Sequence, residues 1–492
     1  MLILVSVVAC NTTDPNPADT TEAEATDAVS ETEAETTTEA AVPTGKVDAP
    51  AYTGVFKTGY DRQDVTPSGE IKMKDGTVLK SILDRVYVTC IAVNDGENTV
   101  LLFTMDAGNV AAGPANTIKA RVSKATKVPE DNIIISGTHT HSAPQVGFPS
   151  GSSANMKWDQ VVYAAFQKAA QNAIADLSDS EVYTGATLAE NMSFVRRWFY
   201  EDGTPGGIWR QPVSGKKIAS YENDSDDLFQ YVRFVRADKK DILLANWGIH
   251  FTNAGNTAIS SDLNFYFRTN IEKLDDDVNF AFYIGPSGNI SFKDYVGGMA
   301  KYNSYAKMGT ELAKQVVKDM SKLTRVEPGK ISVEVIDYDA KVLKDDATRV
   351  ANATKAAAEI AALKLYDGDA KVYAVCAKYG FESAKEVNSV VSRNKDSRGE
   401  YDEIKIVALS FGDIGITGVP YEMFDTNGIE IREASPFKTT IVITGCGGSA
   451  GYVPSALAVP NGGYEVYTTP WEFGTAEIIV NLLVESLRSQ VK

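Results

Sequence analysis

Apolar and polar positions follow two different periods along this chain of 492 residues, and the change of period separates predicted strands from predicted helices. Short apolar runs rich in β-branched residues predict strands at 84–93, 99–105, 133–135, 231–235, 242–249, 278–284, 404–410, 414–419 and 439–444. Apolar residues at helical spacing predict helices at 114–124, 156–177, 300–320, 345–365 and 472–487.

The interleaving of strands and helices favours one large α/β domain (mixed α+β) over residues 51–492, with a mixed sheet and flanking helices. No internal repeat and no linker-like stretch interrupts the pattern after Pro50. Residues 59–67 combine glycine, proline and polar side chains, so we interpret them as a turn-rich segment that leads into the domain.

The first fifty residues have a different composition. Residues 1–10 form an apolar run ending in Val-Val-Ala-Cys, which looks like the signal peptide of a bacterial lipoprotein with a lipidated Cys10. Residues 11–50 are mainly Thr, Glu, Ala and Asp, a composition that predicts a disordered acidic tether. We therefore expect an extracytoplasmic protein, anchored to a membrane surface at the bacterial cell surface or in the periplasm.

Charge and cysteine content exclude several classes of protein. The formal net charge is -17, and a nucleic-acid partner is not expected because phosphate binding requires a basic face. No run of eighteen apolar residues predicts a membrane-spanning helix. Cys90, Cys376 and Cys446 are widely spaced without a Cys-x-x-Cys pair, so we interpret them as core or free thiols.

The whole chain contains three histidines, and each follows a predicted strand. His139 and His141 stand two apart, and if the strand continued through them, both rings would point to the same side. His250 follows the run at 242–249. A pair of surface histidines is the alternative, but the concentration of all three at two strand ends favours a metal or catalytic centre.

Other strand exits also carry polar side chains, namely Asp106, Ser287, Asn289 and Glu422. Open α/β sheets usually place their sites at such exits. A ligand set of His139, His250 and Glu422 would leave an open position, as in catalytic zinc sites.

Residues 137–144, Gly-Thr-His-Thr-His-Ser-Ala-Pro, resemble the THTHSGP signature of neutral ceramidases and their bacterial relatives, which are zinc-dependent amidases that cleave the N-acyl bond of ceramide. Residues 61–67 resemble the family's DITP segment, residues 249–252 its VHPT segment and residues 259–262 the start of its ISADYPG segment. The resemblance extends over most of the chain from about Val55 and implies the catalytic domain of that family.

The resemblance also implies roles for particular residues. The family binds zinc through two histidines, a glutamate and a tyrosine, which correspond to His139, His250, Glu422 and Tyr452. Tyr464 matches a further tyrosine that stabilises the oxyanion.

Four more residues complete the implied site. Either Arg196 or Arg197 corresponds to an arginine that contacts the substrate, and the sequence leaves both open. Ser291 lies in a segment similar to GDVSPN, in which Asn289 replaces the family's acid. We expect His141 to bind the developing oxyanion or to carry a proton to the leaving amine.

These features predict a zinc-dependent hydrolase that cleaves an N-acyl amide of a lipid-like substrate, as ceramidases do. Hydrolysis of another amide or ester, such as an acylated sugar or amino acid, and a non-catalytic ligand-binding lipoprotein are the alternatives. Because the chain ends about forty residues after Tyr452, no C-terminal immunoglobulin-like domain is expected. The oligomeric state does not follow from the sequence.

Overall fold

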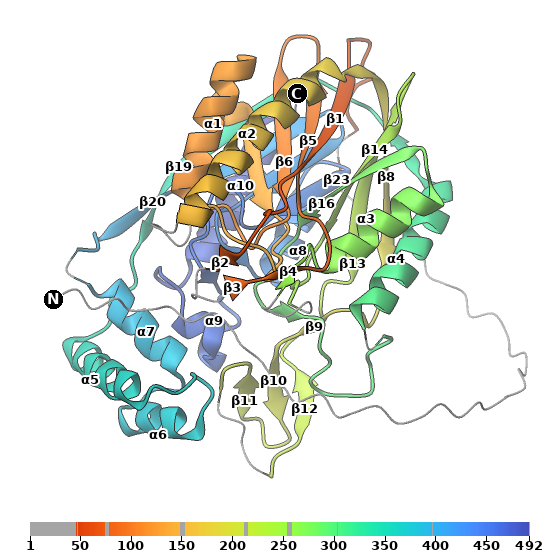
Figure 1. Cartoon of the computed structure of the whole chain (residues 1–492). Helices are drawn as coiled ribbons and strands as arrows, with labels where there is room; N and C mark the ends of the chain where they lie inside the picture. The colour runs from red at the N-terminus through yellow and green to blue at the C-terminus, as the bar shows by residue number, and fades with distance from the viewer. Residues whose placement is uncertain are drawn as a thin grey trace, which may run out of the picture.

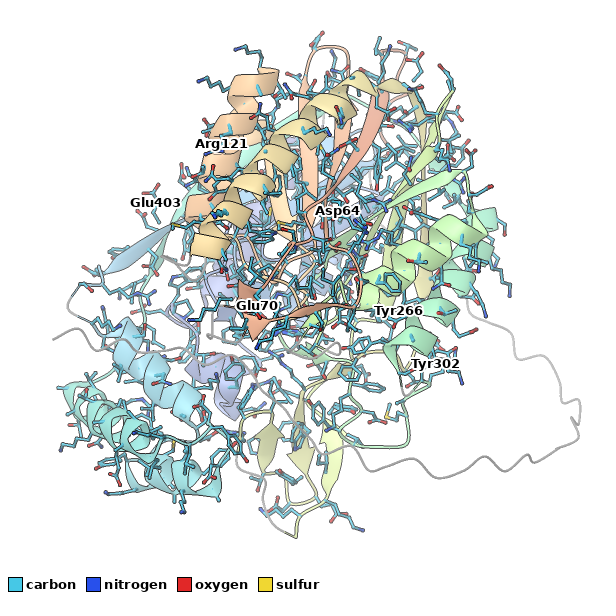
Figure 2. All side chains as sticks on the ribbon, viewed as in Figure 1. Asp64, Glu70, Arg121, Tyr266, Tyr302 and Glu403 are labelled. Atoms are coloured by element: carbon cyan, nitrogen blue, oxygen red, sulfur yellow. The ribbon has the colours of Figure 1, made fainter. Side chains whose placement is uncertain are left out.

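Two β-sheets packed face to face form the centre of the protein, and helices cover the outer face of each (Figure 1). The computed structural model describes residues 46, 48–73, 78–147, 153–210, 215–252, 258–302, 304–395 and 397–491. Figure 2 shows how side chains fill the layers, with charged groups such as Glu70 and Glu403 on the outside.

The larger sheet has nine strands, and its two outermost pairs are parallel while the strands between them are antiparallel. Its order is β16 (Val278–Ile284), β14 (Asp241–Trp247), β13 (Leu228–Arg236), β8 (Ser178–Leu188), β1 (Lys57–Asp64), β5 (Tyr87–Asn94), β6 (Thr99–Met105) and β7 (Ile133–Gly137), with β18 (Thr324–Val326) beside β8.

The two faces of this sheet have different partners. In β5, Val88 and Cys90 point to helices α1 (Ala112–Thr126) and α2 (Ser153–Ala175), whereas Ile91 points to the second sheet. Helices α3 (Leu263–Leu274) and α4 (Tyr305–Asp319) cover the part of the outer face formed by β13, β14 and β16.

The second sheet contains β19 (Ile331–Lys341), β20 (Tyr401–Phe411), β21 (Ile414–Gly418) and β23 (Thr439–Ile443). Helices α8 (Asp425–Ala434) and α10 (Thr475–Ser489) cover its outer face. The rings of Phe56, Phe234 and Phe411 pack together between the two sheets, with centroids 5.7–6.5 Å apart. Burial of this apolar surface from water holds the two sheets together.

A helical insert, residues 342–400, separates β19 from β20 and lies at the lower left of Figure 1. It contains α5 (Ala347–Leu363), α6 (Ala370–Lys378) and α7 (Ala384–Arg393), which pack around an apolar cluster of their own. Each helix begins after a residue whose side chain accepts a hydrogen bond from a backbone N–H of the first turn, namely Asp346, Asp369 and Ser383.

Short strands and short helical turns lie in the segments that connect the strands of the two main sheets. They are β2 (Ile71–Lys72), β3 (Val78–Leu79), β4 (Ser81–Ile82), β9 (Phe194–Val195), β10 (Arg197–Tyr200), β11 (Pro205–Gly207), β12 (Ile218–Tyr221), β15 (Ala258–Ile259), β17 (Ile290–Ser291), β22 (Glu422–Met423), β24 (Tyr452–Val453) and α9 (Tyr464–Tyr467), with short 3-10 turns at Glu130–Asn132, Met320–Lys322 and Val459–Asn461.

The predicted mixed α/β fold with a mixed sheet and flanking helices is confirmed, and a separate four-stranded sheet packs against the nine-stranded one. The strands predicted at 99–105 and 278–284 have the observed bounds. The interpretation of residues 59–67 as a turn-rich segment is wrong, because most of them form β1 in the middle of the large sheet. Gly59 permits this, since a Cβ there would lie 1.9 Å from the carbonyl oxygen of Ala173 in α2.

Cys90, Cys376 and Cys446, the cysteines that the structure describes, are free and buried, as predicted. The predicted signal peptide with Cys10 and most of the predicted tether lie outside the described residues. Contacts of the domain begin slightly before residue 51, because the backbone N–H of Ala49 donates to Asp413 at 2.8 Å. Among the helices that the structure describes, none has the length and apolar character needed to cross a membrane.

Candidate metal centre

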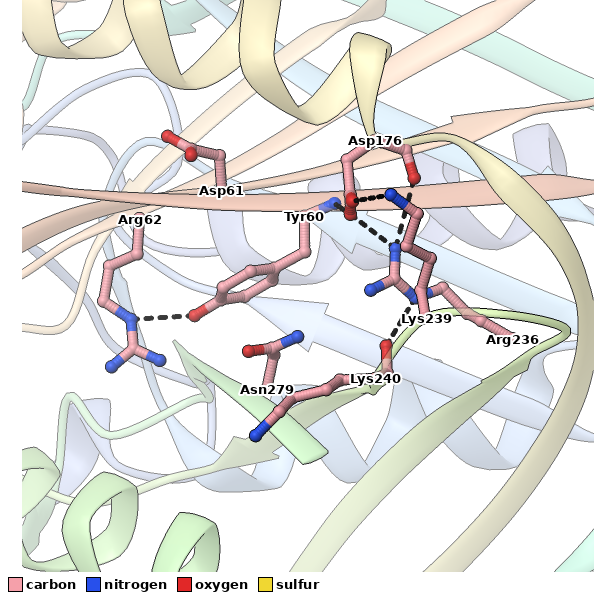
Figure 3. A pocket seen from close by; sticks show the side chains of 8 residues that line it. All are labelled: Tyr60, Asp61, Arg62, Asp176, Arg236, Lys239, Lys240 and Asn279. Carbon is pink, nitrogen blue, oxygen red and sulfur yellow. Dashed lines mark hydrogen bonds and ion pairs between the residues drawn. The ribbon is translucent and has the colours of Figure 1, made fainter. Parts of the chain in front are cut away.

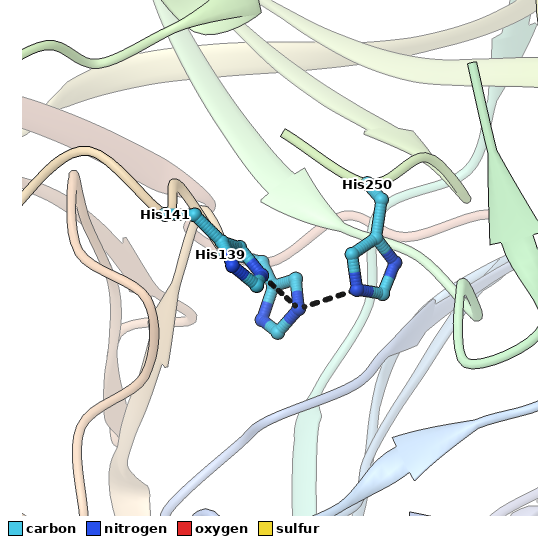
Figure 4. A group of neighbouring side chains, drawn as sticks. All are labelled: His139, His141 and His250. Carbon is cyan, nitrogen blue, oxygen red and sulfur yellow. Dashed lines mark hydrogen bonds between the residues drawn. The ribbon is translucent and has the colours of Figure 1, made fainter. Parts of the chain in front are cut away.

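The three histidines meet at one point, although His250 lies more than a hundred residues after His139 and His141 in the chain (Figure 4). The Nε2 atom of His139 lies 3.1 Å from that of His250 and 3.3 Å from that of His141. Within the described part of the chain, they form a group whose ligand atoms all lie within 4.8 Å of one another.

A sharp turn, and not a continued strand, brings His139 and His141 together. Strand β7 ends at Gly137, and His139 has a left-handed backbone with φ 65°. The strand on which the predicted alignment of the pair depended therefore ends before His139, although the two rings do converge. The turn is held by the backbone N–H of His141, which donates to the carbonyl oxygen of Phe251 at 2.9 Å, next to His250.

Hydrogen bonds to carbonyl oxygens determine which nitrogens of two rings face the centre. The Nδ1 atom of His139 lies 3.0 Å from the Gly108 oxygen, and that of His250 lies 3.0 Å from the Ser287 oxygen. A carbonyl only accepts, so each Nδ1 donates, and a neutral ring then presents a lone pair at Nε2. Two such lone pairs 3.1 Å apart would repel each other unless a proton or a metal ion lay between them.

Glu422 adds an oxygen to this group. Its Oε2 lies 3.4 Å from Nε2 of His139 and 3.5 Å from Nε2 of His250, and accepts no hydrogen bond from the described residues. Glu422 starts β22, which pairs with β24 so that Glu422 stands opposite Tyr452. The donor set of imidazole nitrogens and a carboxylate oxygen fits a divalent transition metal such as zinc.

Burial keeps these groups in the protonation states that a metal requires. It lowers the pKa of His141 to about 3 and the pKa of His250 well below its usual value, with Arg196 adding to both effects. Burial opposes the charge on Glu422, but His139 and Arg196 hold the pKa of this carboxyl below its usual value. Burial and Glu422 raise the pKa of Tyr452 well above its usual value, so this phenol is neutral until a cation binds.

The structure separates the two arginines that the sequence left open. Arg196 reaches the centre, with Nη1 3.3 Å from Nε2 of His250, and its guanidinium lies 5.2 Å from the centre of the Tyr452 ring. Arg197 points to Glu222 and Glu465, at 2.5 Å and 3.1 Å. Arg196 therefore borders the histidines, whereas Arg197 belongs to a buried ion-pair network behind them.

Two further predicted residues occupy different positions. The Tyr464 ring lies 5.2 Å from that of Tyr452, at the start of α9, and is half-buried. Ser291 is buried in β17 opposite Phe194, and its hydroxyl accepts from the backbone N–H of Lys293. The contacts described for Ser291 do not include the histidines.

Asn289 and Glu465 position Arg196, and the sequence analysis did not assign this role to either. The backbone N–H of Arg196 donates to the Asn289 oxygen at 2.8 Å, and the Arg196 Nε donates to Glu465 at 2.8 Å. The side chain of Asn289 in turn donates to Asp425 at 2.6 Å. Burial raises the pKa of Asp425 to about 6. The position of Glu465 directly after Tyr464 was the signal available in the sequence.

Asp106, the fourth strand-exit residue, lies beneath the histidine turn. It accepts hydrogen bonds from Asn264 at 2.7 Å and Arg268 at 3.0 Å, both in α3. The hydroxyl of Thr138, next to His139, lies 3.5 Å from the same carboxylate. Asp106 therefore connects the end of β6 and helix α3 with the turn that carries His139 and His141.

A separate hollow of about 530 Å³ opens near the amino-terminal ends of β14 and β16, whereas His250 follows the carboxyl end of β14 (Figure 3). It is lined by Tyr60, Asp61, Arg62, Asp176, Arg236, Lys239, Lys240 and Asn279. Asp176 pairs with both Arg236 and Lys239. Because Arg236 and Lys239 already have Asp176 as a partner, we assign no function to the hollow.

The chain is similar to neutral ceramidases in part of its sequence and in its fold. No protein-family model matches the chain. Neutral ceramidases of Drosophila pseudoobscura pseudoobscura and Drosophila melanogaster are each 27% identical to it over 241 residues, which is 44% of this chain and 32% of each relative. The matched region therefore spans about a third of the length of these curated relatives.

Solved structures show the same fold. The crystal structure of neutral ceramidase from Pseudomonas aeruginosa superimposes with a TM-score of 0.64 and 16% identity, covering 89% of this chain and 75% of that one. A ceramidase complexed with C2 has the same score and identity and is covered to 76%. Local sequence similarity and the shared fold together relate this chain to the neutral ceramidases.

Proposed function

We propose that this protein is a zinc-dependent hydrolase that cleaves an N-acyl amide bond, with ceramide or a related acyl amide as substrate. The observation that carries the proposal is the pair of Nε2 lone pairs of His139 and His250, 3.1 Å apart, beside the unbonded Oε2 of Glu422. The similarity to neutral ceramidases supports the choice of substrate class.

In this proposal His139, His250, Glu422 and Tyr452 hold the ion. Zinc bound there would polarise the scissile carbonyl and bring the pKa of a bound water towards neutrality. The neighbouring side chains would bind the oxygen that gains negative charge during the reaction.

Arg196 and His141 border the centre and are suited to bind the oxygen that gains negative charge. Arg196 is fixed by Glu465 and by the Gly288 oxygen, to which its Nη2 donates at 2.7 Å, so it presents Nη1 without reorganisation. His141 remains neutral, because burial lowers its pKa to about 3, and a neutral imidazole retains one N–H to donate. Tyr464 lies beyond Tyr452 and supplies a second hydroxyl on that side.

We also propose that the protein acts at a membrane surface, through lipidation of Cys10 and the acidic segment that follows it. The support is the Val-Val-Ala-Cys motif and the composition of residues 11–50. Substitution of Cys10 by Ser should move the protein from the membrane fraction of a bacterial host to its soluble fraction. An unchanged distribution would contradict the anchor.

The test of the central proposal combines metal content with turnover, in a soluble chain that starts near Lys46. About one zinc per chain and hydrolysis of a fluorogenic ceramide that a chelator abolishes are expected. Zinc without ceramide turnover would direct the search to other acyl amides and esters. Absence of zinc would overturn the proposal of a zinc-dependent hydrolase and favour the alternative of a ligand-binding protein.

A further inference from the structure

A row of aromatic rings runs from the metal centre to the helical insert. The first ring is that of Tyr452, over which the guanidinium of Arg196 lies. The second is the Tyr464 ring, with its centroid 5.2 Å from that of Tyr452. The next ring is Trp209, with its centroid 6.3 Å from that of Tyr464. The ammonium group of Lys385, in α7, lies 5.3 Å from the centre of the Trp209 ring.

Trp209 has an unusual backbone conformation, with φ 59°. A left-handed conformation is uncommon for a bulky residue and persists where its surroundings impose it. Among the other described residues of this kind, Lys127 and Lys364 cap the ends of helices, and His139 belongs to the metal centre.

The residues on both sides of Trp209 are anchored. The backbone N–H of Ile208 donates to the carbonyl oxygen of Arg196 at 3.3 Å. Arg210 forms two hydrogen bonds to Glu382, which also accepts from the hydroxyl of Tyr467 in α9. One neighbour of Trp209 therefore connects to the metal centre and the other to the insert, and this double attachment holds the indole in its position.

We infer that Tyr464 and Trp209 form the wall of a subsite that binds an alkyl chain of the substrate, and that Trp209 determines how long a chain is accepted. The inference rests on the proposed function. Both rings are half-buried, so each retains apolar surface that a chain can cover. The row begins at the residues that would hold the scissile amide, so a longer chain would reach Trp209 after Tyr464.

An acyl amide has two alkyl chains, one on the acyl side and one on the amine side, and either could bind to Tyr464 and Trp209. Two series of substrates distinguish them. One substrate series keeps the amine and varies the acyl chain from two to sixteen carbons, and the other keeps a short acyl group and varies the amine chain. In Trp209→Ala, the ratio of kcat/KM for the longest and shortest substrates should fall on the order of tenfold in one series. Zinc content should remain at the wild-type level.

Two variants complete the test. Trp209→Phe should lose less discrimination than Trp209→Ala, because it retains a ring. Tyr366→Ala, which removes a ring that is 65% exposed on the helical insert, should retain the wild-type ratio. An unchanged ratio in both series for Trp209→Ala, or an equal loss for all chain lengths, would overturn the inference.

A binding measurement separates this inference from the proposed hydrolysis. Laurate or dodecylamine should change the tryptophan fluorescence of the wild-type protein, and the change should be smaller in Trp209→Phe, whereas acetate should have no effect. This result is expected even if no amide is hydrolysed. Equal fluorescence changes in both proteins would mean that no chain reaches Trp209.

Discussion

His139 and His250 each use one ring nitrogen to bind a backbone carbonyl, and this bond determines what the other nitrogen can do. A proton shared between the two Nε2 atoms would also remove their repulsion. On His250, burial and Arg196 disfavour that proton, because they lower the pKa of this ring well below its usual value. A metal ion is the partner that the proposed function assigns to the pair, with the carboxylate of Glu422 beside it.

Substitution of each histidine tests how the pair divides its roles. His139→Ala and His250→Ala should each lose both zinc and activity. His141→Ala should retain zinc and lose rate by roughly 10²- to 10³-fold, because one donor to the developing oxyanion is removed. Elemental analysis and turnover of the same preparations provide the measurement. Loss of zinc from His141→Ala as readily as from His139→Ala would show that His141 is a ligand.

Asp425 provides a prediction about pH, because its pKa is raised by burial from 3.8 to about 6. A folded-state pKa above the unfolded one means that the neutral carboxyl stabilises the fold. This contribution is complete below about pH 4 and is lost as the pH rises through 6. Relative to Asp425→Asn, the free energy of unfolding of the wild type should fall by on the order of 3 kcal/mol between pH 4 and pH 8. Denaturant unfolding of both proteins at several pH values measures this change. If the difference in unfolding free energy between the wild type and Asp425→Asn did not vary with pH, the pKa of Asp425 would not be raised in the folded state.

Among the elements, strands β6 and β16 were predictable because most residues of each are apolar, and many are β-branched or aromatic. Strand β1 was missed because six of its eight residues are polar or charged and it contains Gly59. Its identity depends on the close approach of α2, which a local pattern does not encode. The turn at His139 was missed for a similar reason, because a left-handed histidine has no sequence signature.

The link between α3 and the end of β6 predicts a large loss of stability. Arg268→Ala leaves the carboxylate of Asp106 buried without its cation, which should cost about 3–5 kcal/mol of unfolding free energy. Arg85→Ala is the matched control, since this arginine pairs with Asp64 on the surface and its side chain is 68% exposed. The control should lose about 1 kcal/mol or less. Similar losses in the two variants, measured by urea unfolding, would contradict the role of Asp106 as a tie.

At the scale of the whole molecule, the candidate site joins segments from His139 to Tyr464. The resemblance of short motifs predicted a set of site residues, and the fold brings most of them together. Their roles in binding and catalysis stay predictions. Asn289, Glu465 and Trp209 could not be assigned their positions in advance. Their surroundings come from distant segments, and only the folded chain shows what each side chain contacts.

The helical insert leaves and rejoins the second sheet at a single register pair, Lys341 opposite Tyr401. Residues 342–400 can therefore vary in length or be exchanged between homologous proteins without moving either strand. The proposed metal ligands lie outside this stretch, so such exchanges would alter the surroundings of Trp209 and leave these ligands in the chain. We expect natural variation among close homologues to concentrate in this stretch, and with it their choice of substrate.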